Sequence, residues 1–212
     1  MDSAQKKSGM QLPQPTILPT KFYTRSTTDV ARALLGKRLV SHREGVLTAG
    51  WIVETEAYLP ESDSACHSTR GETRGNRSMF GAAGRAYVYP IHSRHCFNVV
   101  TQQAAEGTAV LVRAVQPVCG ITAMMRRRGN GKPVNLCRGP GRLCEAMGID
   151  RSLDGHQLTL AENLWIDDFD ALNVDPAQIK VTERIGVTSA KDLPLRFVVA
   201  GSRYVSGPLR MR

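Results

Sequence analysis

The sequence predicts an α+β fold, a single compact domain in which helices pack around a mixed, largely antiparallel sheet. Short runs rich in β-branched and aromatic residues recur along the chain. These runs do not alternate regularly with helical segments, and no internal repeat is present. With 212 residues the chain is long enough for one substantial core. We expect residues 16–212 to form the domain and residues 1–15, which are polar and interrupted by prolines, to be a disordered tail.

The first half of the domain begins with a capped helix and a hairpin. Residues 27–36 contain a Thr-Thr-Asp start, apolar residues at helical spacing and a final glycine, which predict a short helix. A hairpin is predicted from Arg38 to Glu56, turning near residues 43–45. Residues 60–84 are rich in Gly, Ser, Arg and Glu and predict a long loop that either carries function or is disordered.

The second half alternates less regularly between strands and helices. Apolar runs predict strands over 86–89, 95–101 and 108–115. Residues 117–128 carry apolar side chains at helical spacing and precede Gly129, so they predict a helix, and a second short helix should start near Pro140. Two or three further strands are expected, over about 164–167, 179–182 and 195–200.

The most informative segment is the strand from Trp51 to Tyr58. Successive side chains of a strand point to opposite faces, so Ile52, Glu54, Glu56 and Tyr58 should form one row that passes from apolar to acidic. A carboxylate beside apolar groups at the end of a strand can accept a proton near neutrality. The alternatives are an edge strand with two solvated glutamates, or the two-carboxylate site of an O-glycosidase.

Charge and cysteine content narrow the class of protein. The net charge of +9 suits a polyanionic partner, and six basic residues with no acidic one lie between Arg126 and Arg142. That cluster could also serve RNA, an acidic protein or anionic lipid, or be a solvated helix end. No apolar run approaches a membrane span, no signal-peptide core is present, and the five cysteines form no C-x-x-C pair. We therefore expect an intracellular protein with reduced, buried thiols and no membrane association.

Several motifs in register resemble the alkyladenine (3-methyladenine) DNA glycosylase family. They are V-E-T-E-A-Y at 53–58, H-S at 67–68, N-R-x-M-F at 76–80, R-A-Y-V-Y at 85–89, the run at 95–101, A-V-L-V-R-A at 109–114, G-P-G-R-L-C at 139–144, R-I-G-V at 184–187 and P-L-R-F at 194–197. The resemblance spans about Thr20 to Ser206. It implies a compact α/β roll with a curved sheet, and an enzyme that needs no metal or other cofactor.

The resemblance assigns catalytic roles to two residues. Glu56 stands where the family has its water-activating carboxylate, and Arg113 stands where the family has an arginine that helps to hold the water. A cation beside Glu56 would also favour its ionised form. For Glu54 we expect a structural role, such as an ion pair with a loop arginine. Without the resemblance, Arg113 reads equally well as a surface arginine of a strand.

The resemblance also implies a pocket for a nucleotide flipped out of the duplex. Tyr58, His67 and Tyr89 match the family residues that sandwich the flipped base, and aromatic faces attract cationic alkylated purines. Asn98 matches the asparagine at the pocket floor, whose amide can clash with the 2-amino group of guanine. Read without the family, the tyrosines would be packing residues and Asn98 a strand residue that caps a bulge.

Contacts with DNA are expected from two segments. Gly139, Gly141 and Arg142 begin a predicted helix, where free amides and a close backbone suit a phosphate; a plain Gly-Pro turn is the alternative. The second segment contains His92 and Arg94.

His67, with the His92-x-x-His95-Cys96 segment, could instead be read as zinc ligands, an interpretation that the family does not support.

The sequence departs from the family between Tyr89 and Asn98, where it is one residue shorter. Family members insert a tyrosine from this segment into the gap left by the flipped base. His92 takes its place here, or Arg94 if the deletion falls elsewhere. Both are therefore candidate DNA contacts, and we expect His92 to be the wedge.

These features predict a monofunctional DNA glycosylase of base excision repair. It would flip alkylated, and deaminated, purines out of duplex DNA and hydrolyse the N-glycosidic bond with water activated by Glu56. A lyase would need an amine nucleophile, and the nearest lysines to the motifs are Lys37 and Lys132. We expect a monomer whose partner is damaged double-stranded DNA, located with the genome in a bacterial cytoplasm or a eukaryotic nucleus. The alternative is a non-catalytic nucleic-acid-binding protein on the same scaffold.

Overall fold

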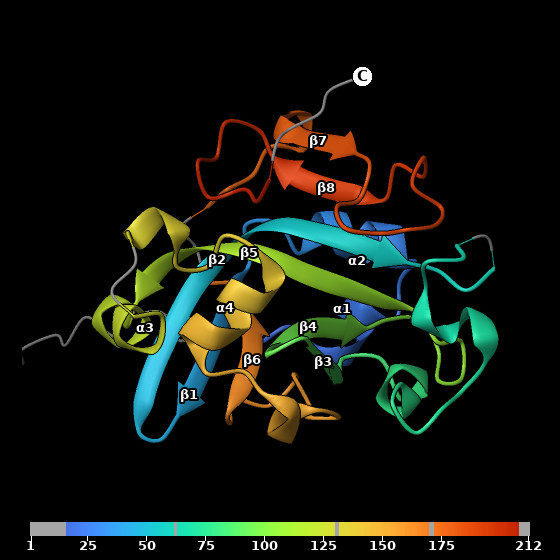
Figure 1. The fold of residues 1–212 in the computed structure, drawn as a ribbon, viewed down its shortest axis with the longest axis horizontal. Coiled ribbons are helices and arrows are strands. Elements are labelled where there is room, and N and C mark those ends of the chain that lie inside the picture. Colours follow the sequence, from blue (N-terminus) through green and yellow to red (C-terminus); the bar gives the residue numbers. More distant parts are fainter. Residues whose placement is uncertain (1–15, 62, 130–131, 170–171, 208–212) are drawn as a thin grey trace, which may run out of the picture.

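The computed structural model describes residues 16–61, 63–129, 132–169 and 172–207. The tail predicted over residues 1–15 lies outside the described residues. An eight-stranded sheet organises the chain, with the order β3-β4-β5-β2-β1-β6, while β8 pairs with β2 and β7 pairs with β8. Every pairing is antiparallel. Figure 1 shows β2 and β5 crossing the middle of the molecule, with β7 and β8 above them and β1 and β6 below. The predicted α+β class is confirmed.

The elements follow the sequence closely. The strands are β1 (Arg38–Arg43), β2 (Val46–Tyr58), β3 (Ala86–Ile91), β4 (Arg94–Val100), β5 (Ala109–Cys119), β6 (Leu164–Asp167), β7 (Ile179–Thr182) and β8 (Arg196–Val199). The α-helices are α1 (Thr20–Tyr23), α2 (Thr27–Ala33), α3 (Ile121–Arg127) and α4 (Pro140–Met147). Short 3-10 helices span His67–Arg70, Arg77–Phe80, Pro133–Asn135, Arg151–Leu153 and Pro176–Gln178.

The first helix and hairpin form where their local signals predict. Ser26 caps α2, because its hydroxyl oxygen accepts a hydrogen bond from the Asp29 amide at 3.2 Å. The β1–β2 turn consists of Glu44 and Gly45, whose φ angles of 53° and 73° match the twist that a two-residue hairpin needs. Helix α1 was not predicted, because its four residues carry no clear periodic pattern.

Two predicted boundaries are wrong in part. The helix expected from Pro117 begins only at Ile121, after Gly120 at φ 71°, since Pro117, Val118 and Cys119 continue strand β5. A register shift between the Ala49–Cys119 and Gly50–Pro117 pairs accommodates the proline, which cannot donate to the ladder. The segment predicted as a loop over 60–84 contains two 3-10 helices in its described part. Asn76 fastens it by donating to the carbonyls of His67 and Gly71.

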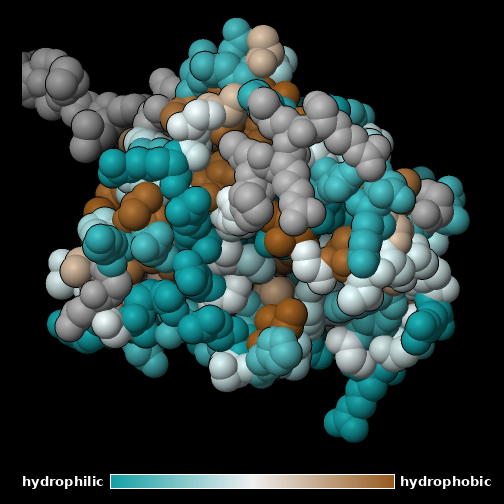
Figure 2. All heavy atoms as spheres, turned by 45° about the horizontal axis from the view of Figure 1, so that its top comes forward, coloured by the Kyte–Doolittle hydropathy of each residue, from teal (hydrophilic) through white to brown (hydrophobic). Residues whose placement is uncertain are grey.

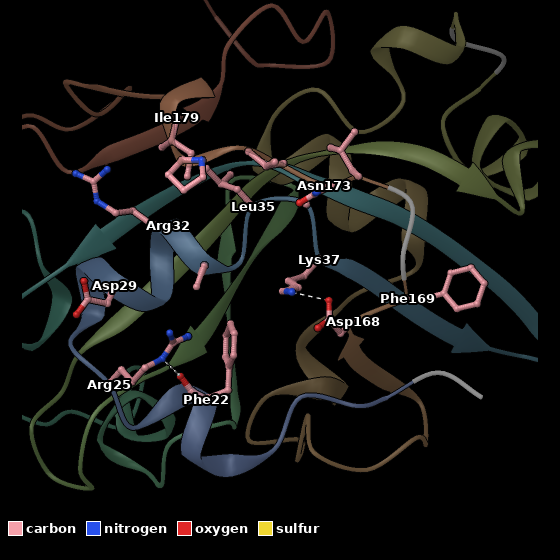
Figure 3. Close-up of a pocket in the computed structure, with 15 residues that line it drawn as sticks. Phe22, Arg25, Asp29, Arg32, Leu35, Lys37, Asp168, Phe169, Asn173 and Ile179 are labelled. Carbon is pink, nitrogen blue, oxygen red and sulfur yellow. Dashed lines mark hydrogen bonds and ion pairs between the residues drawn. The ribbon is translucent and has the colours of Figure 1, made fainter. Parts of the chain in front are cut away.

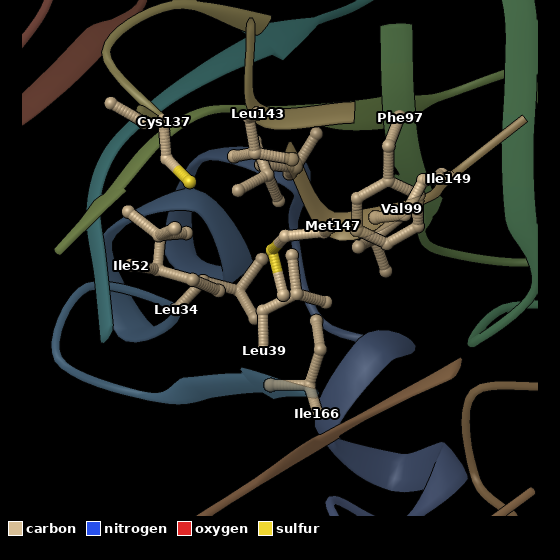
Figure 4. Packing of buried hydrophobic residues seen from close by; sticks show 14 of the residues in the cluster. Leu34, Leu39, Ile52, Phe97, Val99, Cys137, Leu143, Met147, Ile149 and Ile166 are labelled. Atoms are coloured by element: carbon tan, nitrogen blue, oxygen red, sulfur yellow. The ribbon is translucent and has the colours of Figure 1, made fainter. Parts of the chain in front are cut away.

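The hydrophobic core lies on one face of the sheet. Helices α2 and α4 contribute to the same cluster as β3, β4 and β5, and Figure 4 shows Leu34, Leu143 and Met147 packed together there. Core residues of the three strands alternate with Tyr87, Asn98 and Arg113, which therefore face the opposite side. That opposite side carries the candidate site.

The five cysteines are free thiols, as predicted. Four are buried, but Cys119 is exposed at the end of β5, so the expectation that all are buried is wrong at that position. No helix in the described part of the chain combines the length and apolar character needed to cross a membrane.

Candidate functional site

Two buried glutamates of strand β2 form the centre of the site. Glu54 and Glu56 are both inaccessible to solvent. Thr55 between them donates its hydroxyl to the Ala31 carbonyl of α2 at 2.8 Å, so the two glutamates point away from that helix. Strand β2 is flanked on both sides by other strands. The alternative of an edge strand with two solvated glutamates is therefore wrong.

Bulges on β2 and β5 bring Arg113 to both carboxylates. Glu54 pairs with Ala114 and Thr55 pairs with Val112, which leaves Arg113 without an opposite residue. Such irregularities redirect a side chain and are frequent beside active sites. A second register shift separates Ile52 from Glu54, and Ile52 packs in the core. The prediction that Ile52 shares the row of the glutamates is thus wrong.

Arg113 links the two glutamates through different nitrogen atoms. Its Nε donates to Glu54 Oε1 at 3.1 Å, and its Nη1 donates to Glu56 Oε2 at 3.2 Å. The same Nη1 also lies 3.4 Å from the carbonyl oxygen of Ile185. Burial acts to lower the pKa of Arg113, but the charges of Glu56 and Glu54 outweigh it and hold the pKa above its ordinary value. Arg113 is buried, so its alternative interpretation as a surface arginine is wrong.

Glu54 is held by a second arginine and by the C-terminal segment. Arg196 Nε donates to Glu54 Oε1 at 2.7 Å, and the amide and hydroxyl of Ser206 donate at 2.6 and 2.9 Å. The predicted ion pair therefore exists, but its arginines belong to strands rather than to a loop. Burying a charge costs free energy of desolvation, so buried charges are usually paired and hydrogen-bonded, as Glu54 is.

Glu56 has fewer partners than Glu54. Its Oε2 accepts from the Tyr58 hydroxyl at 2.9 Å as well as from Arg113, and its Oε1 accepts from the Ile185 amide at 2.9 Å. Burial and the neighbouring Glu56 charge raise the pKa of Tyr58. Tyr58 therefore stays protonated and donates to the glutamate throughout the neutral range.

The register of five strands aligns the rest of the site with Glu56. Tyr87 pairs with Asn98, Asn98 with Leu111, Leu111 with Glu56, and Glu56 with Arg196. Directly paired residues of antiparallel strands share a face. The row therefore brings Asn98 and Glu56 to the same side of the sheet from strands β4 and β2.

Three rings gather at the β3 end of this row. The His67 and Tyr89 rings meet edge to face with centroids 4.6 Å apart, and the Tyr87 hydroxyl lies 2.9 Å from His67 Nδ1. Tyr58 and Tyr89 pack against one small hydrophobic cluster, which includes Tyr87. Desolvation by the surrounding protein lowers the pKa of His67, so its ring is neutral at pH 7. A cavity of about 470 Å³ is lined by His67, Tyr87 and Tyr89 among others.

Asn98 is buried and its amide is partly engaged. Its Nδ2 donates to the Tyr87 carbonyl at 3.0 Å, within the β3–β4 ladder. One amide hydrogen and the carbonyl oxygen of the side chain are not used in this bond. A polar group therefore lies next to Tyr87, while its role at the floor of a base pocket stays a prediction.

The two candidate wedges differ in their attachment. His92 and Ser93 form the two-residue turn of the β3–β4 hairpin, and His92 is exposed at φ 50°. Arg94 donates from Nε to Glu145 Oε2 of α4 at 3.0 Å. Its side chain also fills the space where a Cβ on Gly141 would lie, 2.9 Å from Arg94 Cδ. His92 projects freely, whereas Arg94 is tied to α4.

Gly139, Gly141 and Arg142 lie at the start of α4, as predicted. Gly139 has φ 124°, a conformation that favours glycine, and Arg142 is exposed. The close approach at Gly141 is made by Arg94. Packing thus accounts for Gly141, while phosphate contact at this helix start stays a prediction.

Two other candidate sites lie outside the glutamate pair. Among the described residues, no three His, Cys, Asp or Glu side chains gather as metal ligands, so His67, His92 and His95 do not assemble the alternative zinc site. A separate open cavity of about 680 Å³ lies beside α2, with Arg25, Arg32 and Lys37 around it (Figure 3). Lys37 there is paired with Asp168 at 2.5 Å, remote from the glutamates.

The sequence assigned no roles to four residues that contact Glu54, Glu56 or His67: Ile185, Arg196, Ser206 and Tyr87. Arg196 did carry a signal, because an arginine inside the apolar strand 195–199 must find a buried partner. Ile185 contributes only its backbone, so its side chain carries no signal.

The chain is similar to known proteins over most of its length. The family model described as methylpurine-DNA glycosylase matches residues 21–203. A protein of Methanoculleus marisnigri is 51% identical over 190 residues, which cover 89% of this chain and 98% of that protein. One of Rhodopirellula baltica is 46% identical over 198 residues, covering 91% of this chain and 84% of the relative. Both carry the name "Putative 3-methyladenine DNA glycosylase".

Proposed function

Because this chain belongs to the methylpurine-DNA glycosylase family, we propose that it excises alkylated purines, 3-methyladenine among them, by water attack on C1′ of a flipped nucleotide. It is a DNA glycosylase of base excision repair, a hydrolase of N-glycosyl bonds. Its partner is damaged DNA. We propose that the protein acts as a monomer and binds this DNA as a duplex.

The arrangement of Glu56, Arg113 and Ile185 carries the proposed mechanism. Glu56 Oε2 and the Ile185 carbonyl are two acceptors that share one donor, Arg113 Nη1, at 3.2 and 3.4 Å. Oε2 also accepts from Tyr58, whereas, among the described residues, Oε1 of the same carboxylate accepts only from the Ile185 amide. A water that donates to Oε1 and accepts from the guanidinium would therefore be activated by Glu56. In the reaction its oxygen bonds to C1′, its proton passes to Glu56, and the electron pair of the glycosidic bond leaves with the base.

The pocket residues support recognition of the flipped base. Tyr58, Tyr89 and the neutral ring of His67 offer aromatic faces that attract a cationic purine without charge repulsion. Asn98 lies on the same face of the sheet as Glu56, where its amide can exclude the 2-amino group of guanine. His92 is positioned at the hairpin tip, where we propose that it fills the gap in the duplex.

The test is base release from a duplex containing one alkylated purine, with enzyme in excess. We expect abasic sites that break only after heat or alkali. Glu56→Gln should reduce the rate by roughly a thousandfold while duplex binding survives.

Asp167→Asn is the matched control. This buried carboxylate is held by Arg38 and Trp165, outside the site, and its amide variant should retain base release. Duplex binding without any abasic product would instead identify a non-catalytic binding protein, and strand scission without heat or alkali would refute the monofunctional mechanism. A Glu56→Gln variant as fast as the parent would show that Glu56 is not the base.

A further inference from the structure

Arg184 lies against the aromatic ring of Tyr58. Its guanidinium carbon is 4.6 Å from the ring centroid, and its side chain is completely buried. Two bonds of 2.5 and 2.6 Å join it to the carboxylate of Asp63, and it also donates to the carbonyls of Ala57 and Ala190. The position of the charge behind the ring is therefore fixed from several directions.

This contact leaves Tyr58 with only one face for a ligand. The Tyr58 hydroxyl is bound to Glu56, so the ring cannot swing away from the guanidinium without breaking that bond. A base stacked on Tyr58 must occupy the face opposite Arg184. The charge of Arg184 does reach the tyrosine: it partly offsets the burial and the Glu56 charge that raise the pKa of the hydroxyl.

We infer that Arg184 and Asp63 set the preference of the pocket between neutral and positively charged lesion bases. The inference rests on the proposed function, in which the flipped base stacks on Tyr58. A cation behind the ring opposes the attraction between the ring and a cationic base such as 7-methylguanine. It does not oppose a neutral base such as hypoxanthine.

The same charge acts on the departing base. Cleavage leaves the electron pair of the glycosidic bond on the base, so a cationic purine departs neutral. A neutral purine departs with a developing negative charge unless it gains a proton. The guanidinium of Arg184 stabilises that negative charge through the ring and favours the neutral substrate in the bond-breaking step as well.

Asp63 moderates this effect. It is buried, pairs with Arg184 through both carboxylate oxygens, and accepts further bonds from the amides of Leu59 and Ala65. Removing the Asp63 charge would expose the base to the full Arg184 charge, whereas removing Arg184 would leave a negative charge near Tyr58. The two neutralising substitutions therefore have opposite consequences for selectivity, which a general loss of structure would not produce.

The experiment measures single-turnover release of hypoxanthine and of 7-methylguanine from duplexes of one sequence. Asp63→Asn, which keeps one of the two acceptor oxygens, should raise the ratio of hypoxanthine to 7-methylguanine release by roughly three- to tenfold. Arg184→Gln should lower that ratio by a similar factor. The double variant, which removes both charges, should fall between the two single variants. Asp167→Asn, which neutralises a buried carboxylate paired with Arg38 elsewhere, should leave the ratio unchanged.

Ratios separate selectivity from overall damage to the neighbouring Ile185 contact, and thermal unfolding identifies any variant that does not fold. If Arg184→Gln fails to fold, Asp63→Asn and the double variant decide. If the parent releases only one of the two bases, the rate for that base decides. Asp63→Asn should raise a hypoxanthine rate or lower a 7-methylguanine rate, and Arg184→Gln should do the opposite. A parent that releases neither of these bases nor 3-methyladenine refutes the proposed function, and a parent that releases 3-methyladenine alone refutes a preference between the two bases set by Arg184. If the parent is active but the ratio is the same in the single variants, or changes in the same direction in both, the role of Arg184 is refuted and the proposed function is not.

Discussion

Glu54 and Glu56 lie two positions apart on one strand, yet their hydrogen bonding differs. A carboxylate offers about four acceptor sites. Glu54 accepts four hydrogen bonds, from Arg113, Arg196 and twice from Ser206. Glu56 accepts from Tyr58, Arg113 and Ile185. Among the described contacts, Glu56 thus accepts one bond fewer than Glu54, and its Oε1, which accepts only from the Ile185 amide, keeps an acceptor site for a water.

Asn98, the proposed floor of the base pocket, gives a prediction about selectivity. Asn98→Ser should remove the clash with the 2-amino group and raise the release of undamaged guanine relative to methylated adenine. The loss of the bond to the Tyr87 carbonyl should cost about 1 kcal/mol of unfolding free energy. Competition between a normal and a methylated duplex measures the ratio. An unchanged ratio with reduced stability would show that Asn98 is purely structural.

His67 gives a prediction about pH. Desolvation lowers the pKa of His67 from its ordinary value of about 6.5. The ring is therefore neutral above a pH of about 6.5 and becomes charged only at a lower pH. Protonation would repel a cationic base, so release of 7-methylguanine should fall relative to hypoxanthine as the pH decreases below about 6.5. The ratio of the two rates should be independent of pH in His67→Gln. A ratio that falls equally in that variant would assign the titration to another group.

At the scale of elements, the β3–β4 hairpin carries the two candidate wedges. A two-residue turn places His92 at the tip and makes Arg94 the first residue of β4, where it is bound to Glu145 of α4. The imidazole ring is smaller than the phenol ring that the family uses. We therefore expect the flipped state to be held less firmly than a tyrosine would hold it.

The prediction for this hairpin compares paired with mismatched lesions. His92→Ala should slow excision most in a fully paired duplex, where extrusion costs more, and least opposite a mismatch. His92→Tyr should restore or exceed the parent rate. Single-turnover rates on both duplexes test this. If His92→Ala matches the parent on both duplexes and Arg94→Ala does not, the wedge is Arg94.

The packing of β2 against β5 gives a prediction about stability. A Cβ at Gly50 would lie 2.7 Å from Val115 Cγ2 and 2.8 Å from the Gln116 carbonyl oxygen, beside a register shift. Gly50→Ala should therefore lower the free energy of unfolding by about 2 kcal/mol. Gly75→Ala, whose Cβ would meet only Thr73 Oγ1 at 3.8 Å, should change it by less than about 0.5 kcal/mol. Denaturant unfolding of both variants checks this, and equal effects would contradict the packing argument.

At the scale of the whole molecule, the net charge of +9 is only partly available to a ligand. Of the six basic residues between 126 and 142, three are bound internally: Arg127 to the Ala146 carbonyl, Arg128 to Glu145 and Arg138 to the Val205 carbonyl. Arg126, Lys132 and Arg142 are exposed. Figure 2 shows one face of the molecule, on which hydrophilic side chains surround smaller hydrophobic areas.

The whole-molecule prediction concerns salt. Duplex affinity should fall linearly with the logarithm of salt concentration, and Arg142→Gln should reduce the slope by about one, as for one lost phosphate contact. Arg25→Gln is the matched control, because Arg25 is exposed beside the separate cavity near α2. Fluorescence anisotropy at several salt concentrations measures both slopes. Equal slopes for Arg142→Gln and the parent would contradict the predicted phosphate contact at the start of α4.

The sequence by itself determined most elements of this protein, because their signals are local. The cap of α2, the Glu44–Gly45 turn and the alternation that sets Glu54 and Glu56 on one face depend on neighbouring residues. Motif order was sufficient to predict the family. These signals did not extend to the shifted start of α3 or the separation of Ile52 from the glutamate row, which depend on β-bulges.

Only the tertiary structure decided how the carboxylates are held. Ile185 lies 129 positions from Glu56, and Ser206 lies 152 positions from Glu54, so no local pattern could pair them. The Ile185 contact uses backbone atoms, which every residue possesses, and the position of Arg184 against Tyr58 follows from how two distant segments meet. Local sequence selects which groups a strand presents. The packing of distant segments decides which of those groups are filled with partners and which remain free to act.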